Sequence, residues 1–217
     1  DSKGLVVKSR GGLAEHKLPY AHDHAPVADF ASAVKALKPT AIIGVAASAK
    51  AFTREVVATM AALNQHPIIF ALSNPTSKTE CTPAEAYEWS EGRALYASGS
   101  PFDPITWSGR RFVTRQGNNS YIFPGVGLGA IAVRATRVTD AMFMAAARTL
   151  ASTVTEADLA QGSLYPPLAD VRSVSARIAA AVAEVAYAEG LAQVERPADL
   201  LEYVQSHMYD PRYPTYA

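Results

Sequence analysis

The sequence predicts an α/β fold in which a parallel sheet is followed by a helical C-terminal segment. Two continuous apolar runs, at 41–45 and 67–72, are typical of strands that are buried on both faces of a parallel sheet. Between them, the large apolar residues of 52–64 recur at helical spacing, which completes a strand–helix–strand unit. After Pro124 the sequence changes to alanine-rich helical periodicity, and no further strand is predicted.

Two more strand candidates and one more helix belong to the first half. A short apolar run at 94–97 predicts a third strand, and the fragment 5–7 predicts a fourth. A helix over 29–37 should end before Pro39, because proline disfavours helical backbone in the residue that precedes it.

The second half of the chain predicts helices only. Thr139 or Asp140, Thr155 and Asp170 are residues of the types that cap helix N-termini, and Pro197 suits a first helical turn. The expected elements are helices at 127–138, 140–150, 156–161, 171–188 and 197–209, followed by an extended tail at 209–217 that docks on another surface.

Composition and charge exclude several protein classes. The 217 residues are 49% hydrophobic and 18% charged, which is enough to build a core, yet no apolar run reaches the roughly 20 residues that span a bilayer. Lys plus Arg and Asp plus Glu both number 20, so the net charge is zero and a general nucleic-acid binder is not expected.

Cys81 is the single cysteine, which excludes an intrachain disulfide and favours a reducing compartment. Because residue 1 is Asp1, we expect the chain to begin partway through a longer protein.

A glycine-rich segment at 125–130, Gly-Val-Gly-Leu-Gly-Ala, matches the G-x-G-x-x-A pattern of dinucleotide-binding loops. In such loops the glycines let a pyrophosphate approach the N-terminus of a helix. The pattern needs a second strand that ends in an acidic residue, and the sequence after 130 is helical instead. We therefore interpret these glycines as sites of close helix packing.

The first residues combine an acid with several cations. Asp1 precedes an apolar triplet, and Lys3, Lys8, Arg10 and Lys17 outnumber the acidic residues around them. An acid at a strand end can hold a ribose, and nearby cations can hold its 2′-phosphate. The alternative is a basic loop that faces water, because charge runs usually do. On composition alone the water-facing loop is the favoured interpretation, and ribose or phosphate binding stays open.

Asparagines lie in two loops that follow predicted strands. Asn74 comes directly after the run at 67–72, and Asn118 and Asn119 lie in the second loop. Ligands of open α/β sheets bind beyond the carboxyl ends of the strands. An amide donates and accepts hydrogen bonds without a charge, which suits a carboxylate, a hydroxyl or a carboxamide. Asparagine also favours turns, so a binding role and a turn-forming role are both open.

Two other polar clusters are less informative. His22 and His24 could share one face of an extended segment, but two imidazoles make an incomplete zinc site, so we expect a solvated pair and no metal ligands. The segment 98–102, Ser-Gly-Ser-Pro-Phe, lacks the strand, nucleophile and helix order of a nucleophile elbow. We expect it to form a tight turn near the ligand.

Taken in order, six segments resemble the C-terminal half of a malic enzyme of the large eukaryotic type. Each segment is modest alone, but their order and spacing are specific, and they cover nearly the whole chain with weaker agreement after Asp170. The segments are DSKGLVVKSR (1–10), KPTAIIGVAA (38–47), PIIFALSNPTSKTEC (67–81), GRALYASGSPFDP (92–104), QGNNSYIFPGVGLG (116–129) and GSLYPPL (162–168).

The resemblance implies an incomplete doubly wound, Rossmann-like parallel sheet in 1–124 and a helical segment in 125–217 that packs on it. It also implies an oxidoreductase that converts (S)-malate to pyruvate and CO2 while reducing NADP, with NAD as the less favoured cofactor and Mg2+ or Mn2+ as the metal. The family's habit further implies a homo-oligomer, tetrameric in the complete enzyme, in the cytoplasm or the mitochondrion. No nucleic-acid or membrane partner is expected.

The resemblance also assigns roles to individual residues. Asp1 closes the second strand of the dinucleotide-binding domain, and Lys17 falls where a lysine favours NADP in related enzymes. The glycines at 125–130 lie on a helix on the substrate side. The malate and nicotinamide site is lined by Asn74, Asn118 and Asn119, and the cofactor set is Asp1, Ser2, Lys3, Lys17, Gly44, Val45, Ala46 and Asn74.

Some of the family's machinery has no counterpart in these residues. Its glycine-rich cofactor loop, acidic metal ligands, catalytic lysine and catalytic tyrosine correspond to positions before residue 1. Malate oxidation needs a base, a metal and an acid, so we expect no catalytic or metal-binding residue here and no activity of the chain alone. The alternative is a catalytically silent nucleotide-binding or assembly module.

Overall fold

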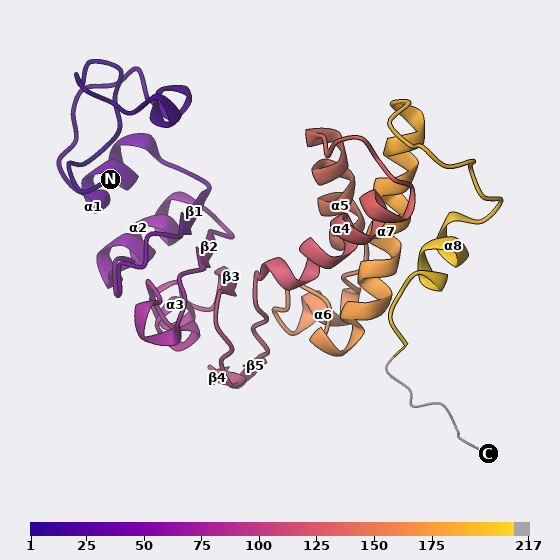
Figure 1. The fold of residues 1–217 in the computed structure, drawn as a ribbon. Helices are drawn as coiled ribbons and strands as arrows, with labels where there is room; N and C mark the ends of the chain where they lie inside the picture. Colours follow the sequence, from indigo (N-terminus) through magenta and orange to yellow (C-terminus); the bar gives the residue numbers. More distant parts are fainter. Residues whose placement is uncertain (211–217) are drawn as a thin grey trace. The chain divides into compact units, whose positions relative to one another are not determined.

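A computed structural model describes residues 1–210 of the chain. These residues form two compact units, of which the first is Asp1–Gln116 and the second begins at Gly117. Figure 1 labels the helices and strands of both units. All but the first two residues of the expected tail at 209–217 lie outside the described residues.

The first unit is built on a three-stranded parallel sheet. Its strands are β1 (Ala41–Gly44), β2 (Ile68–Ala71) and β3 (Leu95–Ser98), in the order β1-β2-β3. The register pairs the last residue of each strand with the last residue of its neighbour. Three predicted strands are thereby confirmed, and because all three are parallel, their carboxyl ends meet at one edge of the sheet.

Helices α1 (Phe30–Leu37) and α2 (Arg54–Leu63) confirm two predicted helices. Before α1, the carboxylate of Asp29 accepts a hydrogen bond from the amide of Ser32 at 2.8 Å. The helix ends at Lys38, whose left-handed backbone (φ 48°) turns the chain just before the proline that was expected to stop it. Local capping chemistry therefore sets both ends of α1.

Helix α3 (Pro83–Trp89) is an element that the sequence interpretation misses. It begins with a capping box, in which the Glu85 amide donates to the Thr82 hydroxyl at 3.3 Å and the Thr82 amide donates to the Glu85 carboxylate at 2.7 Å. The pattern T-x-x-E with proline in the first turn was the available signal. The helix is too short for hydrophobic periodicity to reveal it.

The three helices cover one face of the sheet. Ile42, Ile69 and Tyr96 are buried in a core that includes residues of α1, α2 and α3. On the opposite face Ile43 is 61% exposed and Leu95 is 38% exposed. The prediction of strands buried on both faces is therefore wrong for the described residues, because α1, α2 and α3 all contribute to a single core on one side.

The fragment 5–7 is not a strand. Val7 makes one isolated parallel bridge to His22 and is buried. A short 3-10 helix, Glu15–Tyr20, interrupts the segment between them. The prediction of a fourth strand is wrong, because within residues 1–210 this fragment forms one isolated bridge and no strand ladder.

A hairpin of β4 (Ile105–Trp107) and β5 (Arg110–Phe112) also escapes the sequence interpretation. Both residues of its two-residue turn, Ser108 and Gly109, have positive φ (48° and 78°), as type I′ hairpin turns require. Phe112 stacks on Tyr87 of α3 with ring centroids 3.9 Å apart, which ties the hairpin to the core of the first unit.

The second unit is helical, as predicted. Its longest helix, α7, contacts α4, α5 and α8, and Figure 1 shows these helices arranged around it. The hydroxyl of Tyr121, which precedes α4, donates to the carbonyl of Pro166 at 2.7 Å and closes one end of the core. The helices are α4 (Phe123–Ala132), α5 (Asp140–Ser152), α6 (Glu156–Ala160), α7 (Val171–Ala188) and α8 (Leu200–Ser206).

Helix boundaries in the second unit follow local caps. Thr155 caps α6 with a full capping box, whereas Thr139 and Asp170 occupy N-cap positions without a side-chain cap. The expected start of the last helix at Pro197 is wrong, because the carboxylate of Asp199 accepts hydrogen bonds from the next amides and starts α8 there. The helix expected at 127–138 begins and ends earlier, since the proline in the first turn of α4 suits a helix start.

The glycines of 125–130 lie where α4 packs on α7. A methyl group at Gly129 would lie 2.5 Å from the carbonyl oxygen of Ala179, and one at Gly125 would lie 2.7 Å from Cβ of Ile178. Gly127 points elsewhere, with nothing within 4 Å of such a group. The interpretation as sites of close helix packing is therefore confirmed for Gly125 and Gly129 and is wrong for Gly127.

This geometry predicts opposite effects of two alanine substitutions in α4. Gly129→Ala should destabilise the second unit by about 1–3 kcal/mol, because the methyl group meets the backbone of α7. Gly127→Ala, the matched control, should stabilise it by about 0.5–1 kcal/mol through helix propensity. Urea unfolding monitored by circular dichroism measures both values, and equal effects would contradict the packing role.

Candidate functional site

Three loops leave the sheet at the carboxyl edge. Residues 45–50 follow β1, residues 72–76 follow β2, and residues 99–102 follow β3. This edge is where open α/β sheets bind ligands. Several of the predicted site residues lie at this edge, among them Val45, which is 72% exposed, and Asn74.

Asn74 is held by the loop after β3. The Ser100 hydroxyl donates to Oδ1 of Asn74 at 2.7 Å, and Gln116 Nε2 donates to the Gly99 carbonyl at 3.0 Å. The amide nitrogen of Asn74 has no hydrogen-bond partner in the part of the chain that the structure describes. Its free N–H groups can therefore donate to a carboxylate or a carbonyl oxygen.

Ser100 and Gln116 are site residues that sequence reasoning missed. Both lie in segments that carry the resemblance, 92–104 and 116–129, but neither was assigned a role. At 98–102, where a tight turn was expected, the chain instead bends at 99–100 without a hydrogen-bonded turn, and the Ser98 hydroxyl donates to the Ser100 carbonyl at 2.8 Å. The available signal for Ser100 was its position directly after a strand end.

Asn118 and Asn119 belong to the second unit and differ in their environment. Oδ1 of Asn118 accepts a hydrogen bond from the Ser120 amide at 2.9 Å and caps the short 3-10 helix Asn119–Tyr121. The side chain of Asn119 is exposed and lacks a hydrogen-bond partner among residues 1–210. Oδ1 of Asn118 therefore serves a local cap, whereas the amide nitrogen of Asn118 and the whole amide of Asn119 have no hydrogen-bond partner among residues 1–210.

The predicted cofactor-binding residues near the N-terminus line a charged pocket of about 200 Å3. Arg10 donates to both carboxylate oxygens of Asp1 at 3.0 Å, and Lys17 Nζ donates to one of them at 2.8 Å. Ser2 and Lys3 line the same pocket, and the Lys3 amide donates to Asp1 at 3.0 Å. The structure thus brings Asp1, Ser2, Lys3 and Lys17 together.

Arg10 also lines this pocket, although it was not among the predicted cofactor-binding residues. Its two-point contact with Asp1 is the geometry that arginine makes with carboxylates and phosphates, and its side chain is only 19% exposed. Two cations against one carboxylate leave a net positive pocket, which suits an anionic ligand group. The excess of cations in the sequence was the signal for it.

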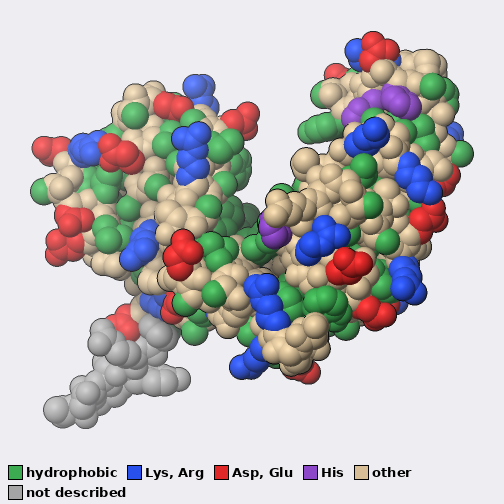
Figure 2. All heavy atoms as spheres, turned by 180° about the vertical axis from the view of Figure 1, so that it is seen from behind, with side chains coloured by type: hydrophobic (Ala, Val, Ile, Leu, Met, Phe, Trp, Pro, Cys, Tyr) green, Lys and Arg blue, Asp and Glu red, His purple; other side chains and the backbone are tan. Residues whose placement is uncertain are grey.

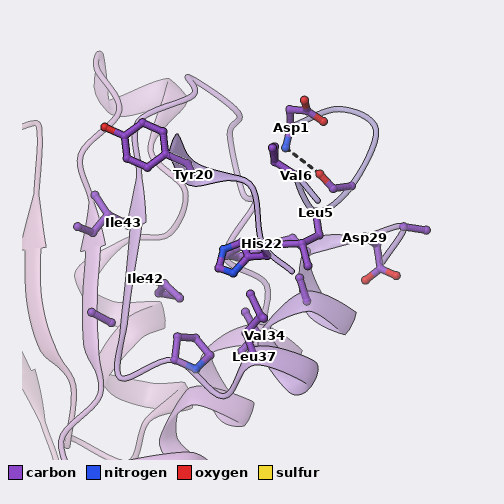
Figure 3. A pocket seen from close by; sticks show the side chains of 16 residues that line it. Asp1, Leu5, Val6, Tyr20, His22, Asp29, Val34, Leu37, Ile42 and Ile43 are labelled. Atoms are coloured by element: carbon purple, nitrogen blue, oxygen red, sulfur yellow. Dashed lines mark hydrogen bonds between the residues drawn. The ribbon is translucent and has the colours of Figure 1, made fainter. Parts of the chain in front are cut away.

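A larger, mostly apolar pocket of about 420 Å3 lies between β1 and α1 (Figure 3). Ile42 and Ile43 of β1 line one side, and Val34 and Leu37 of α1 line another. Polar side chains, including Asp1 and His22, are few. This pocket presents surface for apolar packing and little that could perform acid–base chemistry.

Titratable groups buried in the first unit are unsuited to catalysis near neutral pH. Burial raises the pKa of the Tyr87 hydroxyl to about 12. It likewise raises the pKa of the Cys81 thiol and of the Tyr96 hydroxyl, which donates to the Cys81 carbonyl at 2.8 Å. These three side chains therefore stay neutral and serve the core.

The described residues hold neither a metal-binding cluster nor a membrane-spanning helix. His22 and His24 are both exposed, and residues 1–210 contain no group of three His, Cys, Asp or Glu side chains that could hold a metal ion. No helix in the described part of the chain is long and apolar enough to cross a membrane. On the face seen in Figure 2, acidic and basic side chains are interspersed.

The parallel sheet, its helices and the polar loops at its carboxyl edge define a Rossmann-like α/β protein of the dinucleotide-binding class. A family model described as "Malic enzyme, NAD binding domain" matches residues 1–187. The chain belongs to this family.

Similar proteins agree with the family model. The chain is 54% identical over its whole length to the NADP-dependent malic enzyme of Phaseolus vulgaris, and 53% identical over 98% of its length to NADP-dependent malic enzyme 3 of Arabidopsis thaliana. It spans 37% of the length of each. The solved malic enzyme of Entamoeba histolytica is similar with a TM-score of 0.71 at 25% identity, over 95% of this chain and 40% of that one.

Proposed function

We propose that this chain works as part of an enzyme of the relatives' full length, called the complete enzyme below, that oxidises and decarboxylates (S)-malate to pyruvate and CO2 while reducing NADP. One observation carries the proposal: Asn74, with free amide N–H groups, stands at the carboxyl edge of the sheet in a chain that is 54% identical to an NADP-dependent malic enzyme. In this proposal Asn74, Asn118 and Asn119 orient malate and the nicotinamide by neutral hydrogen bonds.

The proposal assigns binding groups, and no acid, base or metal ligand, to this chain. Its cofactor set is the charged pocket at Asp1, Ser2, Lys3 and Lys17 together with 44–46 at the end of β1. The described residues do not fit a divalent metal, so no step on them runs through Mg2+ or Mn2+. The sequence interpretation divides the chain into a partial dinucleotide-binding domain at 1–124 and a helical segment at 125–217, whereas the compact units divide earlier, between Gln116 and Gly117.

Measured enzymatic activity distinguishes this proposal from the alternative, a catalytically silent nucleotide-binding or assembly module. Because a missing acid or base alone lowers rates by about 100-fold to 10,000-fold, the 217-residue chain by itself should show no detectable pyruvate formation. The complete enzyme should reduce NADP with malate. A coupled assay for pyruvate and the absorbance of NADPH test both statements. A complete enzyme that binds NADP without turnover would favour the silent module.

Assembly and location belong to the same proposal. The complete enzyme forms a homo-oligomer, which would cover exposed apolar residues such as Ile43 and Leu95. Relatives from Oryza sativa and Flaveria pringlei are named as chloroplastic enzymes, a compartment that the sequence interpretation did not consider.

Lys17 provides a test of cofactor preference. In the complete enzyme, Lys17→Gln should raise the Michaelis constant for NADP about tenfold or more, because a charge-assisted contact to the 2′-phosphate is lost. The Michaelis constant for NAD, which lacks this phosphate, should change little. Lys8→Gln is the matched control, since Lys8 pairs with Asp23 on the surface instead of lining the pocket. Equal effects of Lys17→Gln on both cofactors would contradict the assignment.

Asn119 provides a test of substrate binding. Asn119→Asp conserves side-chain shape but places a negative charge beside the carboxylates of malate, so kcat/KM for malate should fall about 5-fold to 150-fold. Its melting temperature should stay close to that of the wild type.

The neighbouring Asn118 is the matched control for stability. Asn118→Ala removes the cap on the Ser120 amide and should cost about 1 kcal/mol of unfolding free energy, which Asn119→Ala should not. Unchanged malate kinetics in Asn119→Asp would return Asn119 to a turn-forming role.

A further inference from the structure

Glu80 is a buried carboxylate for which the proposed function has no use. Its residue is 1% exposed, and both oxygens are engaged by one partner. The Ser73 hydroxyl donates to Oε1, and the Ser73 amide donates to Oε2 at 3.3 Å. Ser73 is the residue directly before Asn74. The carboxylate is therefore hydrogen-bonded to the start of the loop after β2.

The same serine reaches the loop after β1. The Ala47 amide donates to the Ser73 hydroxyl oxygen at 2.9 Å. Ala47 has a left-handed backbone (φ 52°), a conformation that L residues adopt only at an energetic cost. Because the hydroxyl has a single proton, which it donates to Glu80, it meets the Ala47 amide as an acceptor through one of its lone pairs. Glu80, Ser73 and Ala47 thus form one hydrogen-bonded chain between the two loops.

Backbone contacts of the Glu80 segment reinforce this connection. The Lys50 amide donates to the Thr79 carbonyl at 3.0 Å, and the Phe52 amide donates to the Glu80 carbonyl at 3.1 Å. The loop after β1 is therefore attached to the Glu80 segment at its far end and to Glu80 through Ser73 at its near end. Buried polar chains of this kind hold one arrangement when every member is paired.

Gly44 at the end of β1 makes room for the Glu80 side chain. A methyl group there would lie 2.6 Å from Oε1 of Glu80. The sequence interpretation attributed Gly44 to close approach of the cofactor. The structure provides another reason for this glycine, because any larger residue would push the carboxylate out of its site.

We infer that Glu80 is a positioning residue that holds the loops after β1 and β2 in the conformation that binds cofactor and substrate. The inference rests on the proposed function, which puts Val45 and Ala46 of one loop at the cofactor and Asn74 of the other at the substrate. Fixing both loops before binding removes the ordering cost that flexible loops would otherwise incur on binding. Glu80 acts through Ser73 and touches neither ligand.

Amide hydrogen exchange on the 217-residue chain tests the connection itself. In Glu80→Gln one acceptor oxygen is replaced by an NH2 group that opposes a donor of Ser73, and in Ser73→Ala the hydroxyl is absent. Both variants should raise exchange at Ala47 about tenfold or more, under conditions in which α2 keeps wild-type protection. Glu88→Gln, the same chemical change at an exposed position of α3, is the matched control and should leave exchange unchanged.

Steady-state kinetics of the complete enzyme test the positioning role. Glu80→Gln should raise the Michaelis constants for malate and NADP about fivefold or more, with kcat changed less than about threefold. A merely structural Glu80 would instead reduce the folded fraction and lower kcat at unchanged Michaelis constants.

The outcomes separate this inference from the proposed function. Control-like exchange at Ala47, or unchanged Michaelis constants in Glu80→Gln beside a normally active wild type, overturns the positioning role alone. A wild-type complete enzyme that does not reduce NADP with malate overturns the proposed function, and the positioning role with it.

Discussion

The parallel, in-register pairing of β1, β2 and β3 is the constraint on which the rest of the first unit depends. Because the last residues of the strands are paired with each other, three loops that are far apart in sequence leave the sheet side by side. The contacts from Ser100 to Asn74 and from Ala47 to Ser73 exist only because of this shared edge. A binding site at the edge is thus a consequence of sheet topology before it is a property of any one residue.

Polar side chains complete what the sheet begins. Arg93 donates to the carbonyls of Ala61, Asn64 and Gln65, which lie at the C-terminal end of α2 and lack partners within the helix. A cation at this end also interacts favourably with the helix dipole. Glu80 plays the corresponding part beneath the carboxyl edge. In both places a polar side chain makes more than one hydrogen bond and fixes backbone that secondary structure leaves free.

The second unit obeys a different constraint, the close approach of α4 and α7. Gly125 and Gly129 weaken the intrinsic helix propensity of α4, yet they let its backbone approach α7 where any side chain would collide. A glycine pattern that resembles a phosphate-binding loop is thus explained by packing. The distinction depends on the next elements of the chain, because a dinucleotide-binding loop leads through its helix to a second strand, whereas only helices come after these glycines in the described residues.

The sequence by itself determined the fold class, the three paired strands and the existence of the long helices, because hydrophobic periodicity and caps are local signals. Only the tertiary structure decided which side chains meet. Arg10 on Asp1, Ser100 on Asn74 and Glu80 on Ser73 join residues that no local pattern connects, since each pair depends on how loops emerge from packed elements. Helix α3 and the β4–β5 hairpin fall between these cases: their cap and turn signals are local, but the elements are too short for periodicity to reveal. The exposure of the second face of the sheet could not be predicted from the sequence either. An apolar strand has the same sequence pattern whether or not other parts of the described chain cover that face.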